Sequence, residues 1–105
     1  SYACRVSSLT YAGVAQLAGM IQMKELTLDN ILLSDAGLVH LKDMSELTWL
    51  HLGSTQVTDA GLEHLEPLTS LEYLNVSRSG VTPEGAAALK NKLPDTEIVQ
   101  VYENE

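Results

Sequence analysis

Two histidines occupy the positions where a metal site would be sought first. His40 and His64 are 24 residues apart, and Glu63 and Glu66 flank the second. Structural zinc takes four protein ligands, and catalytic zinc takes three and a water. If the chain repeats with that spacing, the imidazoles stand on adjacent helices, about 8–10 Å apart in typical packing. We therefore expect solvated surface histidines, two solvated carboxylates and no resident metal.

The single cysteine, Cys4, is the only candidate thiol nucleophile. No base is placed beside it by the local sequence, and in the 24-residue register it shares a column with Leu28, Leu52 and Val76, which predicts a small core residue. A lone cysteine forms no internal disulfide, and this absence favours a reducing, cytoplasmic compartment. The chain begins at Ser1 and is interpreted as a processed or excised piece, so its compartment stays open.

No other catalytic pattern is present in the sequence. It contains no G-x-S-x-G elbow, no phosphate-cradling glycine loop and no metal-binding Cys/His set. The column of Lys42, Glu66 and Lys90 alternates in sign, which indicates modest surface electrostatics. The sequence therefore predicts a protein that is not an enzyme and carries no cofactor.

Charge and length narrow the possible partners. Six basic residues, scattered along the chain, face fourteen acidic ones, for a net charge of −8. A phosphate backbone or an anionic membrane surface would be repelled, so we expect no nucleic-acid partner. The apolar stretches fall far short of the roughly 20 residues that a spanning helix needs, so we also expect no membrane insertion. The 105 residues suit a single domain covering 1–105.

The elements that position these residues come from an internal repeat of 24 residues. Residues 47–70 read LTWLHLGSTQVTDAGLEHLEPLTS, and residues 23–46 and 71–94 align with them at shifts of 24. Apolar residues share columns, for example Leu26, Leu50 and Leu74. The register extends back to Tyr2, so about four repeats are expected, the first cut short.

Each unit shows two periodicities and a boundary between them. Leu50 and Leu52 alternate with polar residues, which predicts a short strand with one buried face. Leu62, Leu65 and Leu68 stand at three-residue steps, which indicates the inward stripe of a short helix. The boundary is a hydroxyl column expected to cap each helix through its side chain: Thr10, Ser34, Thr58 and Thr82.

The first turn of each predicted helix carries an acid and a glycine. Asp35, Asp59 and Glu84 suit the helix dipole, and Pro83 suits the first helical position. A glycine inside a helix costs about 1 kcal/mol relative to alanine, so the recurring glycine needs a reason. We expect close packing that leaves no room for a β-carbon at Gly13, Gly37, Gly61 and Gly85.

The pattern LxxLxLxxTxVTDAGLxxLxxLxx, carried by residues 47–70, resembles leucine-rich repeats with a TDAGL signature. These are common in bacterial multidomain proteins and are similar to ribonuclease-inhibitor-like repeats. The resemblance implies an α/β right-handed solenoid with parallel strands on the concave side and short helices on the convex side. It also implies a surface that binds other proteins. The chain departs from the family at the asparagine or cysteine ladder, which here reads Ser7, Ile31, Thr55 and Ser79. Hydroxyls can bond the loop backbone, whereas Ile31 interrupts the ladder.

The C-terminal end breaks the period. Leu65 to Leu68 is a three-residue step, whereas Leu89 to Leu93 is four. With one residue inserted, Val99 and Val101 are expected to take the core columns of a closing, capping strand. Ile98 is the competing inward choice.

If the leucines of each strand face inward, their neighbours cover the open face of the sheet. The only tryptophan, Trp49, would lie beside Tyr73, and aromatic residues often anchor interfaces. The competing interpretation is a cross-strand pair that only covers its neighbours. The proposed partner-binding residues of this face are Trp49, His51, Tyr73, Asn75, Glu25 and Thr27.

Two functions remain open. The first is a protein-interaction scaffold that presents the concave strand face to a protein partner. The second is a structural or regulatory repeat segment of a larger multidomain enzyme or complex, docking on its other parts. An unpaired first strand near Tyr2 and Cys4 would permit association through the N-terminal repeat edge.

Overall fold

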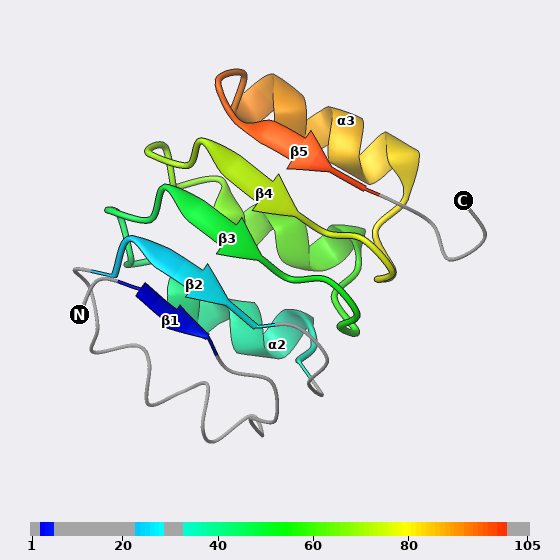
Figure 1. Cartoon of the computed structure of the whole chain (residues 1–105). Coiled ribbons are helices and arrows are strands. Elements are labelled where there is room, and N and C mark those ends of the chain that lie inside the picture. The colour runs from blue at the N-terminus through cyan, green and yellow to red at the C-terminus, as the bar shows by residue number, and fades with distance from the viewer. Residues whose placement is uncertain (1–2, 6–22, 29–32, 101–105) are drawn as a thin grey trace.

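The computed structural model describes residues 3–5, 23–28 and 33–100. Within these residues the strands form one parallel sheet in chain order (Figure 1). They are β1 (Ala3–Arg5), β2 (Glu25–Thr27), β3 (Trp49–His51), β4 (Tyr73–Asn75) and β5 (Glu97–Val99).

The helical segments lie together on one side of this sheet, behind the strands in Figure 1. They are α2 (Asp35–Leu38), η2 (Val39–Leu41), η3 (Asp59–Leu65) and α3 (Pro83–Lys92), of which η2 and η3 are 3₁₀ helices. Strand, turn and helical segment therefore alternate, which is the predicted α/β solenoid.

One 24-residue period of the sequence corresponds to one step from a strand to its neighbour in the sheet. Leu26 pairs with Leu50, and Leu50 pairs with Leu74, in adjacent parallel strands. All three side chains are fully buried. Column mates in the sequence are therefore neighbours in space, and each repeat closes the apolar layer of the one before it.

The three-residue leucine step matches the type of helix that forms. A 3₁₀ helix has three residues per turn, so Leu62 and Leu65, both buried on η3, lie on one face with Leu68 just beyond its end. In α3 the corresponding step from Leu89 to Leu93 is four residues, which suits an α-helix, and both leucines are buried. The inserted residue thus changes the helix type.

Only one of the described hydroxyl caps forms as predicted. Thr82 Oγ1 accepts a hydrogen bond from the Gly85 N–H at 3.1 Å. Ser34 and Thr58 hold the N-cap position with extended backbone but make no side-chain cap bond. Their segments begin with a tight turn in which the N-cap carbonyl accepts from the glycine N–H three residues on, so that donor is already satisfied. Thr10 lies outside the described residues.

The glycine column is a close approach, as expected, and the structure identifies what is approached. A β-carbon on Gly61 would overlap the Asp35 carboxylate, and one on Gly85 would overlap the Asp59 carboxylate. Each aspartate thus serves its own helix start and also reaches into the next repeat. Gly13 lies outside the described residues.

The hydroxyls of the ladder bond to the loop backbone, as predicted. Thr55 Oγ1 donates to the Leu52 carbonyl at 2.8 Å, and Ser79 Oγ donates to the Val76 carbonyl at 2.6 Å. Ser7 and Ile31 lie outside the described residues.

The expected register of the last strand is wrong. Ile98, not Val99, pairs with Leu74 and packs against the core, while Val99 pairs with Asn75. The residue gained in α3 is lost again before β5. Thr96 takes the buried position that Leu71 holds one repeat earlier, with Thr96 N–H bonded to Leu93 O as Leu71 N–H is to Leu68 O. Only Glu97 then lies between Thr96 and Ile98, whereas two residues lie between Leu71 and Leu74. Val101 lies outside the described residues.

Candidate binding site on the strand face

The strands present two rows of side chains on the face opposite the helices. Because the leucine of each strand points inward, the residues on either side of it point outward. We call the first the aromatic row: Glu25, Trp49, Tyr73 and Glu97, in strand order. The second row contains Thr27, His51, Asn75 and Val99.

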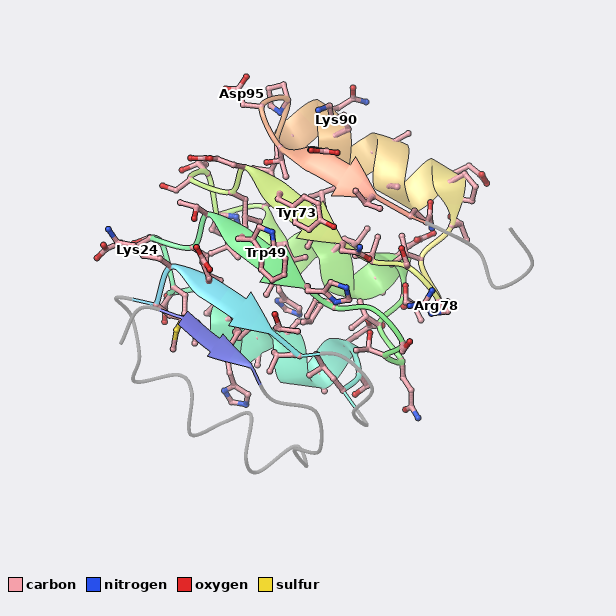
Figure 2. The ribbon with its side chains drawn as sticks, in the orientation of Figure 1. Lys24, Trp49, Tyr73, Arg78, Lys90 and Asp95 are labelled. Carbon is pink, nitrogen blue, oxygen red and sulfur yellow. The ribbon has the colours of Figure 1, made fainter. Side chains whose placement is uncertain are left out.

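Trp49 and Tyr73 stack on one another across β3 and β4. Their ring centroids are 5.2 Å apart and their planes differ by 10°. Both side chains are half-buried, and Figure 2 shows them next to each other over the strand layer. Stacked rings with nearly parallel planes form a firm apolar platform whose conformational freedom is already reduced.

The second row is held in place by its own turns. His51 Nδ1 accepts from the Gly53 N–H at 3.1 Å, and Asn75 Oδ1 accepts from the Ser77 N–H at 2.9 Å. A β-carbon on Gly53 would meet the His51 ring, so glycine makes room for it there. The same side-chain-to-backbone bond thus recurs one repeat later.

The two rows are also linked to each other. The Asn75 amide donates to the Tyr73 hydroxyl at 2.9 Å, and the His51 ring lies 6.0 Å from Trp49 with a tilt of 33°. The stack is therefore supported from the side by an imidazole and an amide.

All six residues predicted for this surface lie on it. Glu25 is exposed and the other five are half-buried. Glu97 was missed, although it stands next to Tyr73 in the aromatic row. Glu97 follows Tyr73 by 24 residues, which would have placed it in the aromatic row. The residue assumed to be inserted between Leu89 and Leu93 moved it out of that register.

The helical side shows no comparable arrangement. His40 and His64 are half-buried, and no group of three or more metal-binding side chains occurs among the residues that the structure describes. None of the described helices has the length and hydrophobicity needed to cross a membrane. Cys4 lies in β1, in register with Leu26, as its column predicted.

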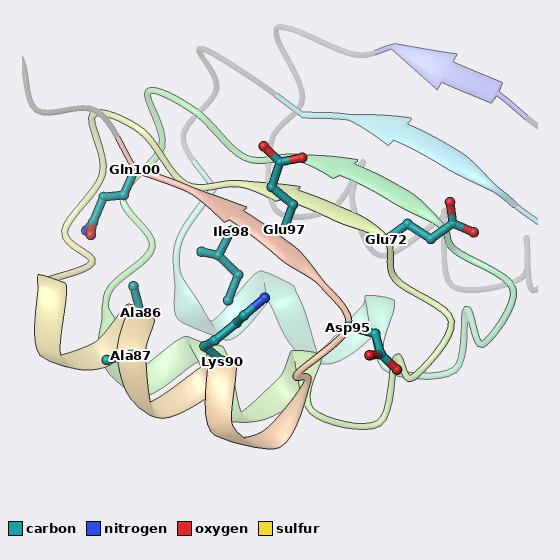
Figure 3. A pocket seen from close by; sticks show the side chains of 8 residues that line it. All are labelled: Glu72, Ala86, Ala87, Lys90, Asp95, Glu97, Ile98 and Gln100. Atoms are coloured by element: carbon teal, nitrogen blue, oxygen red, sulfur yellow. The ribbon is translucent and has the colours of Figure 1, made fainter.

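A hollow of about 600 Å³ opens at the C-terminal end of the solenoid, between α3 and β5 (Figure 3). Ala86 and Ile98 contribute its apolar lining, and the Lys90 ammonium crosses it to donate to the Thr96 carbonyl at 2.7 Å. The remaining lining includes three carboxylates, from Glu72, Asp95 and Glu97. Among the residues that the structure describes, the lining of the hollow contains no nucleophile beside a base.

Comparison with known proteins supports this architecture. Residues 68–90 match a family model described as a leucine-rich repeat. Two internalins of Listeria monocytogenes superpose with TM-scores of 0.69 for internalin C2 and 0.70 for inlF, each at 22% identity and over 85% and 84% of this chain. A leucine-rich-repeat protein of Leptospira interrogans superposes with a TM-score of 0.64 at 20% identity, over 90% of this chain. The chain has a leucine-rich-repeat fold.

The leucine-rich-repeat neighbours are much longer than this chain. The superposed parts cover 38%, 26% and 22% of internalin C2, inlF and the Leptospira protein. A search of curated proteins gave no match. The resemblance therefore concerns the fold, and the TDAGL subtype remains an interpretation of the sequence.

Proposed function

We propose that this protein is an interaction scaffold that binds a protein partner on its strand face, and that it is not an enzyme. The observation that carries the proposal is the Trp49–Tyr73 stack on the outward side of the sheet. Two aromatic side chains fixed on a regular element offer large contact area at little further cost in side-chain entropy. Glu25, Thr27, His51 and Asn75 surround the stack and would form the polar rim.

Two further observations support a binding role. The residues of the rim are fixed by local bonds, such as that from Gly53 N–H to His51, which favours a pre-formed surface. The net charge of −8 disfavours nucleic acid and anionic lipid and leaves proteins as the expected partners.

The experiment compares capture by the wild type and by the double variant Trp49→Ala/Tyr73→Ala. Cell extract is passed over each immobilised protein, and retained proteins are identified by mass spectrometry. A partner of the strand face is retained by the wild type and lost from the double variant, which circular dichroism must show to be folded at the assay temperature. Glu63→Ala/His64→Ala, on the helical side, is the matched control and should retain the partner. Equal retention by both double variants contradicts the proposal.

The alternative is a repeat segment that docks on other parts of a larger protein or complex. Within the described residues β1 is an edge strand, with β2 on one side, and an edge strand can pair with another chain. Under this alternative the Trp49→Ala/Tyr73→Ala change leaves association unaffected. Ala3→Lys or Arg5→Glu, both in β1, would weaken it instead, and sedimentation velocity of the self-association of the chain would show the loss.

A further inference from the structure

The aromatic row carries carboxylates on both sides of the stack. Glu25 pairs in register with Trp49 on one side, and Glu97 pairs with Tyr73 on the other. Both glutamates are exposed. The order across the sheet is therefore acid, indole, phenol, acid.

Each ring of the stack has the other ring on one side and a carboxylate on the other. The two planes differ by 10° and the centroids are 5.2 Å apart, close to the spacing of about 4.8 Å between neighbouring strands. Glu25 is the registered neighbour of Trp49 on β2, and Glu97 is that of Tyr73 on β5. Trp49 with Glu25, and Tyr73 with Glu97, thus form two sites, each made of one ring and one carboxylate.

We infer that each of these two sites receives a cationic side chain, arginine or lysine, from a protein partner. This inference rests on the proposed function and names the chemistry of its partner. The face of an indole or phenol attracts a cation, and an adjacent carboxylate pairs with the same cation. Arginine suits both contacts because its planar guanidinium stacks on a ring while it donates to a carboxylate.

The positions of the protein's own basic residues agree with this inference. The aromatic row contains no lysine or arginine in any of its registered positions. Lys24 and Arg78 stand at opposite ends of the strands, away from the stack (Figure 2). Lys90 lines the same hollow as Glu97, and its ammonium donates to the Thr96 carbonyl at 2.7 Å. The surplus of acidic residues, with a net charge of −8, adds long-range attraction for a basic partner.

The geometry also sets the spacing of the two cations. Each cation contacts a ring and the carboxylate beside it, so the two cations stand at most as far apart as Glu25 and Glu97, which is three strand spacings or about 14 Å. An extended peptide advances about 3.4 Å per residue, so side chains four residues apart span a similar length. The fitting segment is an extended chain that crosses the strands with basic residues at positions i and i+4.

The experiment titrates the full chain with the peptide acetyl-Gly-Arg-Gly-Gly-Gly-Arg-Gly-amide and follows the emission of Trp49. The matched probe replaces both arginines with citrulline, which keeps the shape and removes the charge. The arginine peptide should saturate the Trp49 signal at a concentration at least tenfold lower than the citrulline peptide. A peptide with glutamate in both positions should leave the signal unchanged.

The carboxylates are tested with the double variant Glu25→Gln/Glu97→Gln. It should weaken binding of the arginine peptide at least fivefold while its melting temperature stays near the wild-type value. Glu63→Gln/Glu84→Gln makes the same change of net charge on the helical side and should weaken binding less than twofold. Equal affinity for arginine and citrulline peptides, or equal losses in the two variants, overturns the inference.

The outcome separates this inference from the proposed function. If Trp49→Ala/Tyr73→Ala loses a captured partner while the arginine and citrulline peptides bind alike, the strand face is a binding surface without cation recognition. If an uncharged oligosaccharide saturates the signal and the arginine peptide does not, the platform recognises sugar rings and the inference is wrong.

Discussion

Asp59 and Thr82, in consecutive repeats, are joined by two hydrogen bonds. The carboxylate of Asp59 accepts from the Thr82 N–H at 2.8 Å and from the Thr82 hydroxyl at 2.5 Å. Asp35 and Thr58 make the same pair of bonds one repeat earlier, at 2.7 and 2.5 Å. The TDAG segment thus links repeats as well as starting a helix. The sequence alone does not indicate this role, because aspartate in a first turn already has an explanation in the helix dipole.

We predict that Asp59→Ala lowers the free energy of unfolding by about 1–2 kcal/mol. Two charge-assisted hydrogen bonds are lost, and the partly exposed setting lets water replace part of them. Asp59→Asn keeps an acceptor for the Thr82 N–H and should lose about half as much. Urea denaturation followed by circular dichroism measures both, with Glu63→Ala on the same helix as control. A loss for Glu63→Ala as large as that for Asp59→Ala would contradict the prediction.

Replacing Gly85 with alanine should have opposite effects in two backgrounds. In the wild type the new β-carbon overlaps the Asp59 carboxylate, so we expect destabilisation by about 1–3 kcal/mol. In Asp59→Ala the obstacle is gone, and the better helix propensity of alanine, up to about 1 kcal/mol, should prevail. A double-mutant cycle by urea denaturation gives the coupling energy. Additive effects would mean that Gly85 is required for another reason.

Thr55→Val tests the hydroxyl ladder. Thr55 is 7% exposed, and its hydroxyl bonds the Leu52 carbonyl. Valine has nearly the same shape but leaves that buried carbonyl without a partner, which should cost about 1–3 kcal/mol. Thr69→Val, on an exposed turn, should stay within about 0.5 kcal/mol of the wild type. Similar urea midpoints for the two variants would show that the ladder bond contributes nothing.

The environment of Trp49 provides a direct reading of the strand face. Its indole is half-buried and stacked on Tyr73, so acrylamide should quench its emission, though less than that of a free indole. Tyr73→Ala uncovers the shared ring face and should raise the Stern–Volmer constant. Glu63→Ala, exposed on the helical side, is the control and should leave quenching unchanged. A blue emission protected from acrylamide would place the indole in the core.

The repeat was readable from sequence because stacking imposes it at every layer. Leu26, Leu50 and Leu74 must meet in register, so the period, the strand phase and the outward position of Trp49 follow from one another. The bonds that cross between repeats did not follow, because Asp59 and Thr58 each satisfy a local rule and nothing in their types shows that their partners are in the neighbouring repeat. The stacking of Trp49 on Tyr73 was predictable as proximity, whereas the ring geometry depends on support from His51 and Asn75.

The last strand shows where counting residues fails. The extra residue between Leu89 and Leu93 suggested that every later position shifts by one, but α3 absorbs it as a true α-turn and Thr96 shortens the approach to β5. Buried hydrogen bonds decide this, since Thr96 Oγ1 donates to the Leu71 carbonyl at 2.7 Å. In the sequence, nothing shows that the polar Thr96 takes the position of a buried leucine, so the register of β5 could not be predicted from it.

The register of β5 is tested by Ile98→Ala and Val99→Ala. Ile98 packs against the core with Leu74 as its neighbour, so its truncation should cost about 1–2 kcal/mol, less than a fully buried isoleucine because it is half-buried. Val99 lies in the row of Asn75 on the strand face, and its truncation should cost less than about 1 kcal/mol. Both are measured by urea denaturation. If Val99→Ala were the more damaging change, the strand would have the shifted register, and Glu97 would leave the aromatic row.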